Sequence, residues 1–265
     1  LNGRGISVQA PRYYDLSVRV LHRPSRGGSL DLLMLASDDR FTFLNDDGAV
    51  DLGFTTAFQK LRLRWLRPLG ADWISESTLV AGNEVQSFIF EGDGEAYERP
   101  VIASLRQEVR SDRGEALDAR LGLDLEGGRD RFLYDVGDFG EREEGAAWLL
   151  APAPYAEVTW RPGRWRLTPG LRMDALWLDN GTIIGTVDPR LGVRYPLTDF
   201  TALTGGAGRY SQPPEVRQLL ASGDGGPDLD YGWALQKSVG IEHQFTGSLR
   251  GELTEAERER LAELI

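Results

Sequence analysis

Few residues of the chain are arranged as a metal or catalytic site would need. The clearest candidate is the segment SGDGGPDLDYG, where Asp224, Asp228 and Asp230 supply carboxylate oxygens suited to a hard cation such as calcium. Their spacing does not match an EF-hand loop, and aspartate and glycine are ordinary turn residues. We therefore favour a solvated loop here and predict no metal site.

The chain has few residues with which histidine- or cysteine-based catalysis could be carried out. Only His22 and His243 are present, and cysteine is absent, which excludes disulfides and thiolate metal sites. Serine, histidine and carboxylates do not follow a recognisable triad order, and paired carboxylates occur only in segments such as 141–144. We expect no catalytic residues, no cofactor and no enzyme activity. For His243, near the end of an apolar strand face beside Phe245, we expect an interfacial role.

Three short motifs match functional signatures by their letters alone. Asp138-Phe-Gly140 resembles the kinase magnesium motif but lacks the other kinase segments. Asn180-Gly-Thr182 fits a glycosylation sequon, yet Asn-Gly between two strands first predicts a hairpin. The 205–208 segment, Gly-Gly-Ala-Gly, is not a phosphate cradle, because no helix is expected after it.

The clearest chemical pattern is a row of charges on predicted strands. These residues could line a ligand path, although the interior of a barrel is ordinarily polar and pairs its charges internally, which is the reading we favour. They are Arg166, Arg172, Asp174, Arg190 and Arg194.

The strand predicted over 165–177 positions several of these charges. Its odd-numbered residues are apolar from Trp165 to Trp177, with Leu171 between them, whereas its even-numbered residues include Arg172 and Asp174. A period of two places alternate side chains on opposite faces of a sheet. The strand has about a dozen residues, longer than usual in globular proteins and long enough to cross a membrane when tilted.

Similar alternation occurs along most of the chain and predicts about twelve strands. The connections alternate in length. Long ones are expected at 38–56, 83–100, 127–154, 179–186 and 211–232. This asymmetry is typical of an antiparallel, up-and-down transmembrane β-barrel with short periplasmic turns and long extracellular loops. A soluble β-sandwich remains the alternative with the same alternation.

Aromatic residues lie at the predicted strand ends, as in the girdles of membrane barrels. We expect Trp160, Trp165, Tyr195 and Phe200 in the periplasmic girdle, and Trp177 and Tyr210 in the outer one. The full predicted girdle is Trp65, Trp73, Trp160, Trp165, Trp177, Tyr195, Phe200, Tyr210, Trp233 and Phe245.

Composition limits the other possibilities. The net charge of −11 argues against nucleic acid as a partner. No apolar run reaches the length of a transmembrane helix. The chain begins at Leu1 without a methionine or signal peptide, so we expect a processed or truncated piece.

Four segments in order resemble the barrel of TonB-dependent outer-membrane receptors. They are Pro169-Gly-Leu-Arg-Met-Asp174, Asp188-Pro-Arg-Leu-Gly-Val-Arg-Tyr195, Gly208-Arg-Tyr-Ser-Gln-Pro-Pro214 and Gln236-Lys-Ser-Val-Gly-Ile-Glu-His-Gln-Phe245. The detailed resemblance covers about 155–250, and the looser strand pattern extends it to about residue 12. It implies an all-β fold that forms part of a larger, roughly 22-stranded barrel, without its plug domain.

The resemblance also implies a function. It is active transport of a scarce ligand (a ferric siderophore, cobalamin or a saccharide) across the bacterial outer membrane, with outer-membrane lipid and the TonB complex as partners. External loops, chiefly 127–154 and 211–232, would capture the small-molecule ligand. The alternatives are a soluble carbohydrate-binding module, a passive porin-like channel and a barrel enzyme.

The last residues depart from the barrel pattern. Thr254-Glu-Ala-Glu257 matches a helix capping box, so we expect the barrel over 1–253 and a short helical tail over 254–265.

Overall fold

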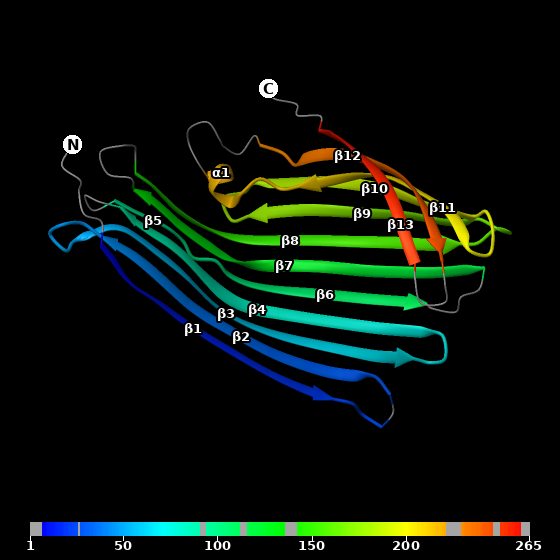
Figure 1. Cartoon of the computed structure of the whole chain (residues 1–265), viewed down its shortest axis with the longest axis horizontal. Coiled ribbons are helices and arrows are strands. Elements are labelled where there is room, and N and C mark those ends of the chain that lie inside the picture. The colour runs from blue at the N-terminus through cyan, green and yellow to red at the C-terminus, as the bar shows by residue number, and fades with distance from the viewer. Residues whose placement is uncertain are drawn as a thin grey trace.

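The computed structural model describes residues 7–25, 27–90, 94–111, 116–135, 142–220, 229–245 and 250–260. Nearly all of them belong to one curved antiparallel sheet (Figure 1). Its strands are β1 Ser7–His22, β2 Ser29–Leu44, β3 Val50–Leu69, β4 Trp73–Phe90, β5 Gly94–Glu98, β6 Val101–Ser111, β7 Leu117–Asp135, β8 Glu143–Trp160, β9 Arg166–Leu178, β10 Ile183–Pro196, β11 Thr201–Gln212, β12 Gly232–Gln244 and β13 Arg250–Arg260. A short helix, α1 Val216–Leu220, lies between β11 and β12.

The strands follow one another across the sheet in chain order, which confirms the up-and-down topology. β5 and β6 both lie between β4 and β7, so the thirteen strands occupy twelve positions. The interruption falls at Pro100, which has no N–H to donate to a neighbouring strand. The ladder is bridged there by a bond from the Arg99 N–H to the Arg131 carbonyl.

The strands are longer than the sequence pattern indicates. The loop expected over 127–154 is wrong, because β7 extends to Asp135 and β8 begins at Glu143. The loops expected over 38–56 and 83–100 are likewise mostly strand. By contrast, the long connection predicted over 211–232 is confirmed between β11 and β12, with α1 inside it.

The helical tail is also wrong over the described residues 254–260. These residues belong to β13, which pairs with β12 from Gln244↔Arg250 to Ala234↔Arg260. The capping-box pattern is a local signal, whereas the edge of β12 offers a row of backbone donors and acceptors. Pairing with that edge outweighs the local helix preference. Residues 261–265 lie outside the described part of the chain.

The turns expected between strands form where glycine permits them. Gly163 has φ of 62° in the β8–β9 turn, and the Trp165 N–H bonds to the Pro162 carbonyl at 3.2 Å. Gly181 has φ of 95° in the β9–β10 hairpin, where the Thr182 N–H donates to Asn180 Oδ1 at 2.9 Å. The hairpin reading of Asn180-Gly-Thr182 is therefore confirmed.

The sheet has two chemically distinct faces. We call the face with Leu171 and Trp177 the apolar face, and the face with Arg172 and Asp174 the polar face. Large side chains on the apolar face are open to solvent, with Val239 62% exposed. Several carboxylates on the polar face are buried, with Asp31 only 4% exposed. This is the reverse of a water-soluble domain, where exposed apolar patches are small, so the soluble sandwich alternative is wrong.

One small hydrophobic cluster covers an end of the polar face. Leu219 of α1 packs there against Ala147, Leu149, Leu176 and Leu178. Among the described residues, no helix has the length and apolarity needed to cross a membrane.

Candidate functional site

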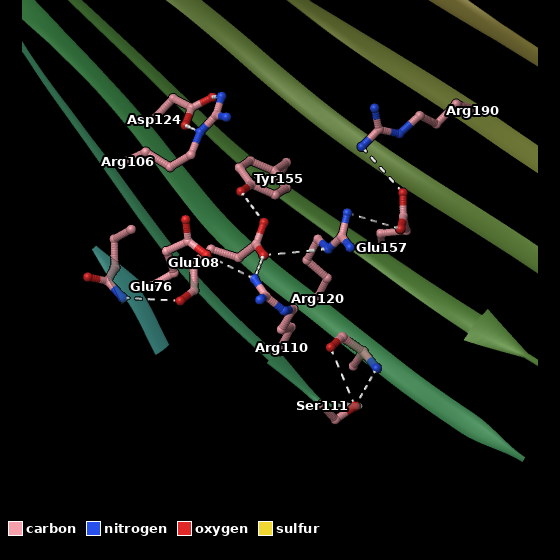
Figure 2. Close-up of polar contacts among 12 residues, drawn as sticks. Glu76, Arg106, Glu108, Arg110, Ser111, Arg120, Asp124, Tyr155, Glu157 and Arg190 are labelled. Carbon is pink, nitrogen blue, oxygen red and sulfur yellow. Dashed lines mark hydrogen bonds and ion pairs between the residues drawn. The ribbon is translucent and has the colours of Figure 1, made fainter. Parts of the chain in front are cut away.

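Ion pairs connect neighbouring strands across the polar face (Figure 2). Asp124 of β7 is at their centre. It binds Arg106 of β6 at 2.6 Å and Arg172 of β9 at 2.7 Å. Arg172 also binds Asp174 on its own strand at 2.9 Å. Charge-assisted pairs of this kind hold both partners in fixed positions.

A second chain of contacts runs beside the first. Figure 2 shows Arg110 between Glu76 and Glu108, at 3.3 Å and 2.9 Å respectively. Glu157 of β8 then lies 3.7 Å from Arg120 and 3.5 Å from Arg190. Further pairs extend the pattern to both sides of the sheet. They are Arg19–Asp31, Arg62–Asp31, Arg64–Glu76 and Arg194–Glu242.

Strand register explains why these side chains meet. One row of paired residues crosses four adjacent strands, from Glu108 of β6 through Gly122 of β7 and Tyr155 of β8 to Arg172 of β9. Because each residue lies directly opposite the next, all four side chains are on one face. Gly122 leaves room for the Tyr155 ring, since a Cβ at this position would overlap it. The Tyr155 hydroxyl can thus donate to Glu108 at 2.9 Å.

We expect Tyr155→Phe to lower the free energy of unfolding by about 1–2 kcal/mol, because it removes one hydrogen bond to a carboxylate. Denaturant unfolding of the barrel in lipid vesicles checks this value. Tyr134→Phe is the control, because that ring stacks with the Arg217 guanidinium at 4.8 Å through its face and keeps this contact without the hydroxyl. An equal loss in both variants would contradict a specific role for the Tyr155–Glu108 bond.

The polar face can bind and orient polar molecules. Two larger hollows open on it. One, of about 480 Å³, is lined by Glu157, Arg190, Tyr210 and Gln236 among others. The other, of about 500 Å³, includes Arg106, Asp124 and Arg172 with Tyr231, whose burial raises the pKa of its hydroxyl to about 12. No three potential metal ligands gather anywhere in the part of the chain that the structure describes.

The charges singled out from the sequence lie where expected. The polar face carries four of them, all in ion pairs: Arg172, Asp174, Arg190 and Arg194. This confirms the prediction that the charges of this face pair with one another. Arg166 lines a smaller hollow on the same face, near Asp118 and Arg161. Sequence reasoning did not single out Glu108, Asp124 and Tyr155. Their alternation indicated a strand face, but only the register across strands identifies their partners.

The other candidate residues have ordinary surroundings. His243 Nδ1 lies 2.9 Å from Thr201 Oγ1, and its ring contacts Phe245 edge-on. Asp230 accepts a bond from the Tyr231 N–H. The 205–208 segment is strand within β11, which confirms that it is no phosphate cradle. Asp224, Asp228 and Asp138-Phe-Gly140 lie outside the described residues.

Tryptophans define a band on the apolar face of β8 and β9. On β8, Trp148 and Trp160 are twelve residues apart (160 − 148), and every outward residue between them is apolar. Trp165, immediately before β9, and Trp177 of β9 are also twelve residues apart (177 − 165). Twelve residues at roughly 3.3 Å each, tilted by about 40°, rise about 30 Å, close to the apolar band of outer-membrane barrels. Trp148 was missed as a girdle residue because it fell in the expected loop 127–154.

Several of the predicted girdle residues lie on the apolar face, as a girdle requires. Trp65, Trp160, Trp165 and Trp177 are 41–50% exposed on the apolar face, and Trp165 packs on Tyr195 with ring centroids 4.7 Å apart. The prediction that Tyr210 belongs to the outer girdle is wrong. Tyr210 pairs with Ala234 beside Gly208↔Gln236 and lines the hollow of the polar face, so it cannot face lipid there. Membership of an interfacial girdle remains a prediction for all the other residues of the set, including Trp73, Phe200, Trp233 and Phe245.

A family model described as "TonB dependent receptor-like, beta-barrel" matches residues 8–254. The chain belongs to the TonB-dependent receptor family. The proteins of this family are bacterial outer-membrane proteins, so the lipid-facing surface of this family member is its apolar face. No curated protein sequence matches the chain.

Solved receptors of this family share the fold at low sequence identity. The ferric yersiniabactin uptake receptor FyuA from Yersinia pestis is 14% identical with a TM-score of 0.71, over 96% of this chain and 48% of that one. The ferric citrate transporter FecA is 14% identical with a TM-score of 0.70, over 93% and 42%. The siderophore receptor PiuA from Acinetobacter baumannii is 8% identical with a TM-score of 0.71, over 93% and 49%. The chain thus spans less than half the length of these receptors.

Proposed function

We propose that this chain forms part of the wall of a receptor that imports a scarce ligand across the outer membrane with energy from the TonB complex. The ion-paired polar face, which continues from β1 to β12, carries the proposal. A wall whose charges already neutralise one another offers a polar surface without a strong net attraction for passing ions. Such a surface suits a path that a ligand crosses and leaves.

The ligand is a ferric siderophore, cobalamin or a saccharide. Among the similar solved structures, FecA is a ferric citrate transporter, FyuA a ferric yersiniabactin uptake receptor and OprC a copper transporter, which favours a metal complex as the ligand of this protein. The external connections capture the ligand. The longest connection that was predicted from the sequence and is also present in the structure joins β11 and β12. The protein performs no covalent chemistry in this proposal, and its TonB contact belongs to a plug domain.

Uptake in the producing bacterium tests the proposal. Labelled ferric siderophores, cobalamin and oligosaccharides are supplied to the wild type, to a strain without this gene and to a strain without tonB. We expect one ligand whose uptake is lost in both mutants. Uptake that needs this gene but not tonB would support the passive channel instead, and equal uptake in all three strains for every ligand would contradict transport.

A further inference from the structure

Two acidic side chains meet on the polar face, just outside the apolar band. Asp130 of β7 pairs with Ala147, one residue beyond Trp148. Glu98 of β5 pairs with Phe132, two residues further along β7 and on the same face. The carboxyl groups of Glu98 and Asp130, which we call the carboxyl pair, are therefore diagonal neighbours on adjacent strands and within hydrogen-bonding reach of each other.

The carboxyl pair has no cation of its own. Asp130 is only 7% exposed, and its Oδ1 atom has no hydrogen-bond partner. Among the described residues, no arginine or lysine forms an ion pair with Asp130 or Glu98, in contrast to Asp124. Two carboxylates in contact repel each other strongly when both are ionised, so the pair holds one proton between them. Glu98 is exposed to solvent, and the pair can therefore exchange this proton with the medium.

The elements around the carboxyl pair add mostly negative charge. The nearby acidic and phenolic groups are Glu84 of β4, Tyr134 of β7, Glu143 of β8 and Glu215 just before α1. The nearby cations already have partners, because Lys60 of β3 binds Glu84 at 3.0 Å and Arg217 of α1 binds Glu143 at 3.4 Å. Neither cation therefore neutralises the pair.

The helix α1 lies beside the carboxyl pair. Leu219 of α1 is 1% exposed and packs against Ala147, the residue directly opposite Asp130. Figure 1 shows α1 at the same end of the sheet as β5. The helix has only five residues, and a helix this short is stable only while it packs on the wall. A modest change in charge beneath it is therefore enough to shift its position.

The charge of the pair and the position of α1 are thermodynamically linked. Partial burial, the charge of Asp130 and the charge of Glu215 raise the pKa of Glu98, and burial raises the pKa of Asp130. A raised carboxyl pKa stabilises the docked state below the ordinary value of about 4, and this stabilisation is lost as the pH rises through the raised value. Because Glu215 belongs to the segment that carries α1, loss of the proton weakens the docking of that segment.

We propose that the carboxyl pair is a pH-sensitive switch that controls the docking of α1 on the wall. With one proton shared by Glu98 and Asp130, α1 stays docked. When that proton passes to water, two adjacent negative charges repel Glu215 and α1 is released. A role of this switch in ligand capture by the β11–β12 connection rests on the proposed function, whereas the switch itself does not.

Electron paramagnetic resonance of the full natural-length receptor in lipid vesicles measures the docking. A nitroxide on Gln218→Cys, at an exposed position of α1, is immobile when the helix is docked and mobile when it is released. We expect the ratio of immobile to mobile label to fall about tenfold between about pH 4 and about pH 8, a coupling of ordinary size. Glu98→Gln keeps a hydrogen bond to Asp130 without titrating, so it should hold α1 docked at every pH. Asp130→Asn should do the same.

Two further variants separate the switch from a general effect of charge. Glu95→Gln is on the same strand as Glu98 but on the opposite face, so it should keep the wild-type response. Glu215→Gln removes the charge that is repelled and should weaken the response. The histidines do not contribute, because His22 and His243 lie at the other end of the strands, beside the β1–β2 and β10–β11 turns.

Three results would overturn the proposal. They are a helix that stays docked at both pH values in the wild type, a response that persists in Glu98→Gln, and a response that is lost in Glu95→Gln. Circular dichroism checks the folding of every variant, and if Asp130→Asn does not fold, Glu98→Gln alone decides the result. The label reports docking without any ligand, so a failure of the proposed transport function would leave this test valid.

Discussion

Replacing Leu171 with arginine is expected to destabilise the folded barrel by about 2–4 kcal/mol, the cost of a cation at the middle of the bilayer on the lipid face. Leu171 lies six residues from both Trp165 (171 − 165) and Trp177 (177 − 171). It is 39% exposed on the apolar face. No residue of β9 is therefore better placed to report on mid-membrane lipid.

The matched control is Leu167→Arg on the same face of the same strand. Leu167 is two residues from Trp165, near the interface, where the cost falls to about 0–1 kcal/mol. Reversible unfolding from lipid vesicles in denaturant measures both free energies. A neutral effect of Leu171→Arg would mean that the lipid-facing and lumenal faces are assigned the wrong way round.

Replacing Asp124 with asparagine should lower the free energy of unfolding by about 1–3 kcal/mol, since charge-assisted hydrogen bonds to two arginines are lost. Arg106 contacts Asp124 twice, at 2.6 Å and 2.8 Å, and has no second carboxylate partner among the described residues. Arg172 keeps Asp174. The substitution also leaves two guanidinium groups close together without the charge that separates them.

Glu126→Gln controls for the change in net charge. Glu126 lies on the same face of the same strand and forms no ion pair with any described residue, so its loss should cost less than about 0.5 kcal/mol. The same unfolding measurement applies to both variants. Equal and small effects would show that the ion pairs of the polar face are screened by water and contribute nothing measurable.

The sequence pattern predicted the up-and-down strand topology and, for many side chains, the face of the sheet on which they lie. Inside the membrane the two faces meet different solvents, so alternation is strict, as it is from Trp165 to Trp177. Beyond the membrane both faces meet water and alternation fades. This is why the ends of β7 and β8, around Asp130, were interpreted as a loop, whereas Gly127 and Gly128, inside the band, carry no side chain that could show alternation.

Two other errors have related causes. The 205–208 segment of glycine and alanine carries no alternating signal, so the face of Tyr210 could not be counted from its neighbours. The helical tail rested on a local capping pattern, whereas β13 depends on the distant edge of β12. The ion pairs of the polar face could not be predicted either, because they too join residues that are distant in sequence. Asp124 and Arg172 are 48 residues apart in sequence, and only the register brings them together.

A nitroxide scan of β9 in vesicles tests the central claim most directly. The chain has no cysteine, so single cysteines can be introduced from Leu167 to Trp177 and spin-labelled. Collision rates with oxygen, which concentrates in lipid, are compared with those of a water-soluble nickel chelate. We predict a period of two, with oxygen favoured at Leu171 and Met173 and nickel at Arg172 and Asp174. Absence of the period, or oxygen favoured at Arg172 and Asp174, would contradict a membrane wall with this orientation.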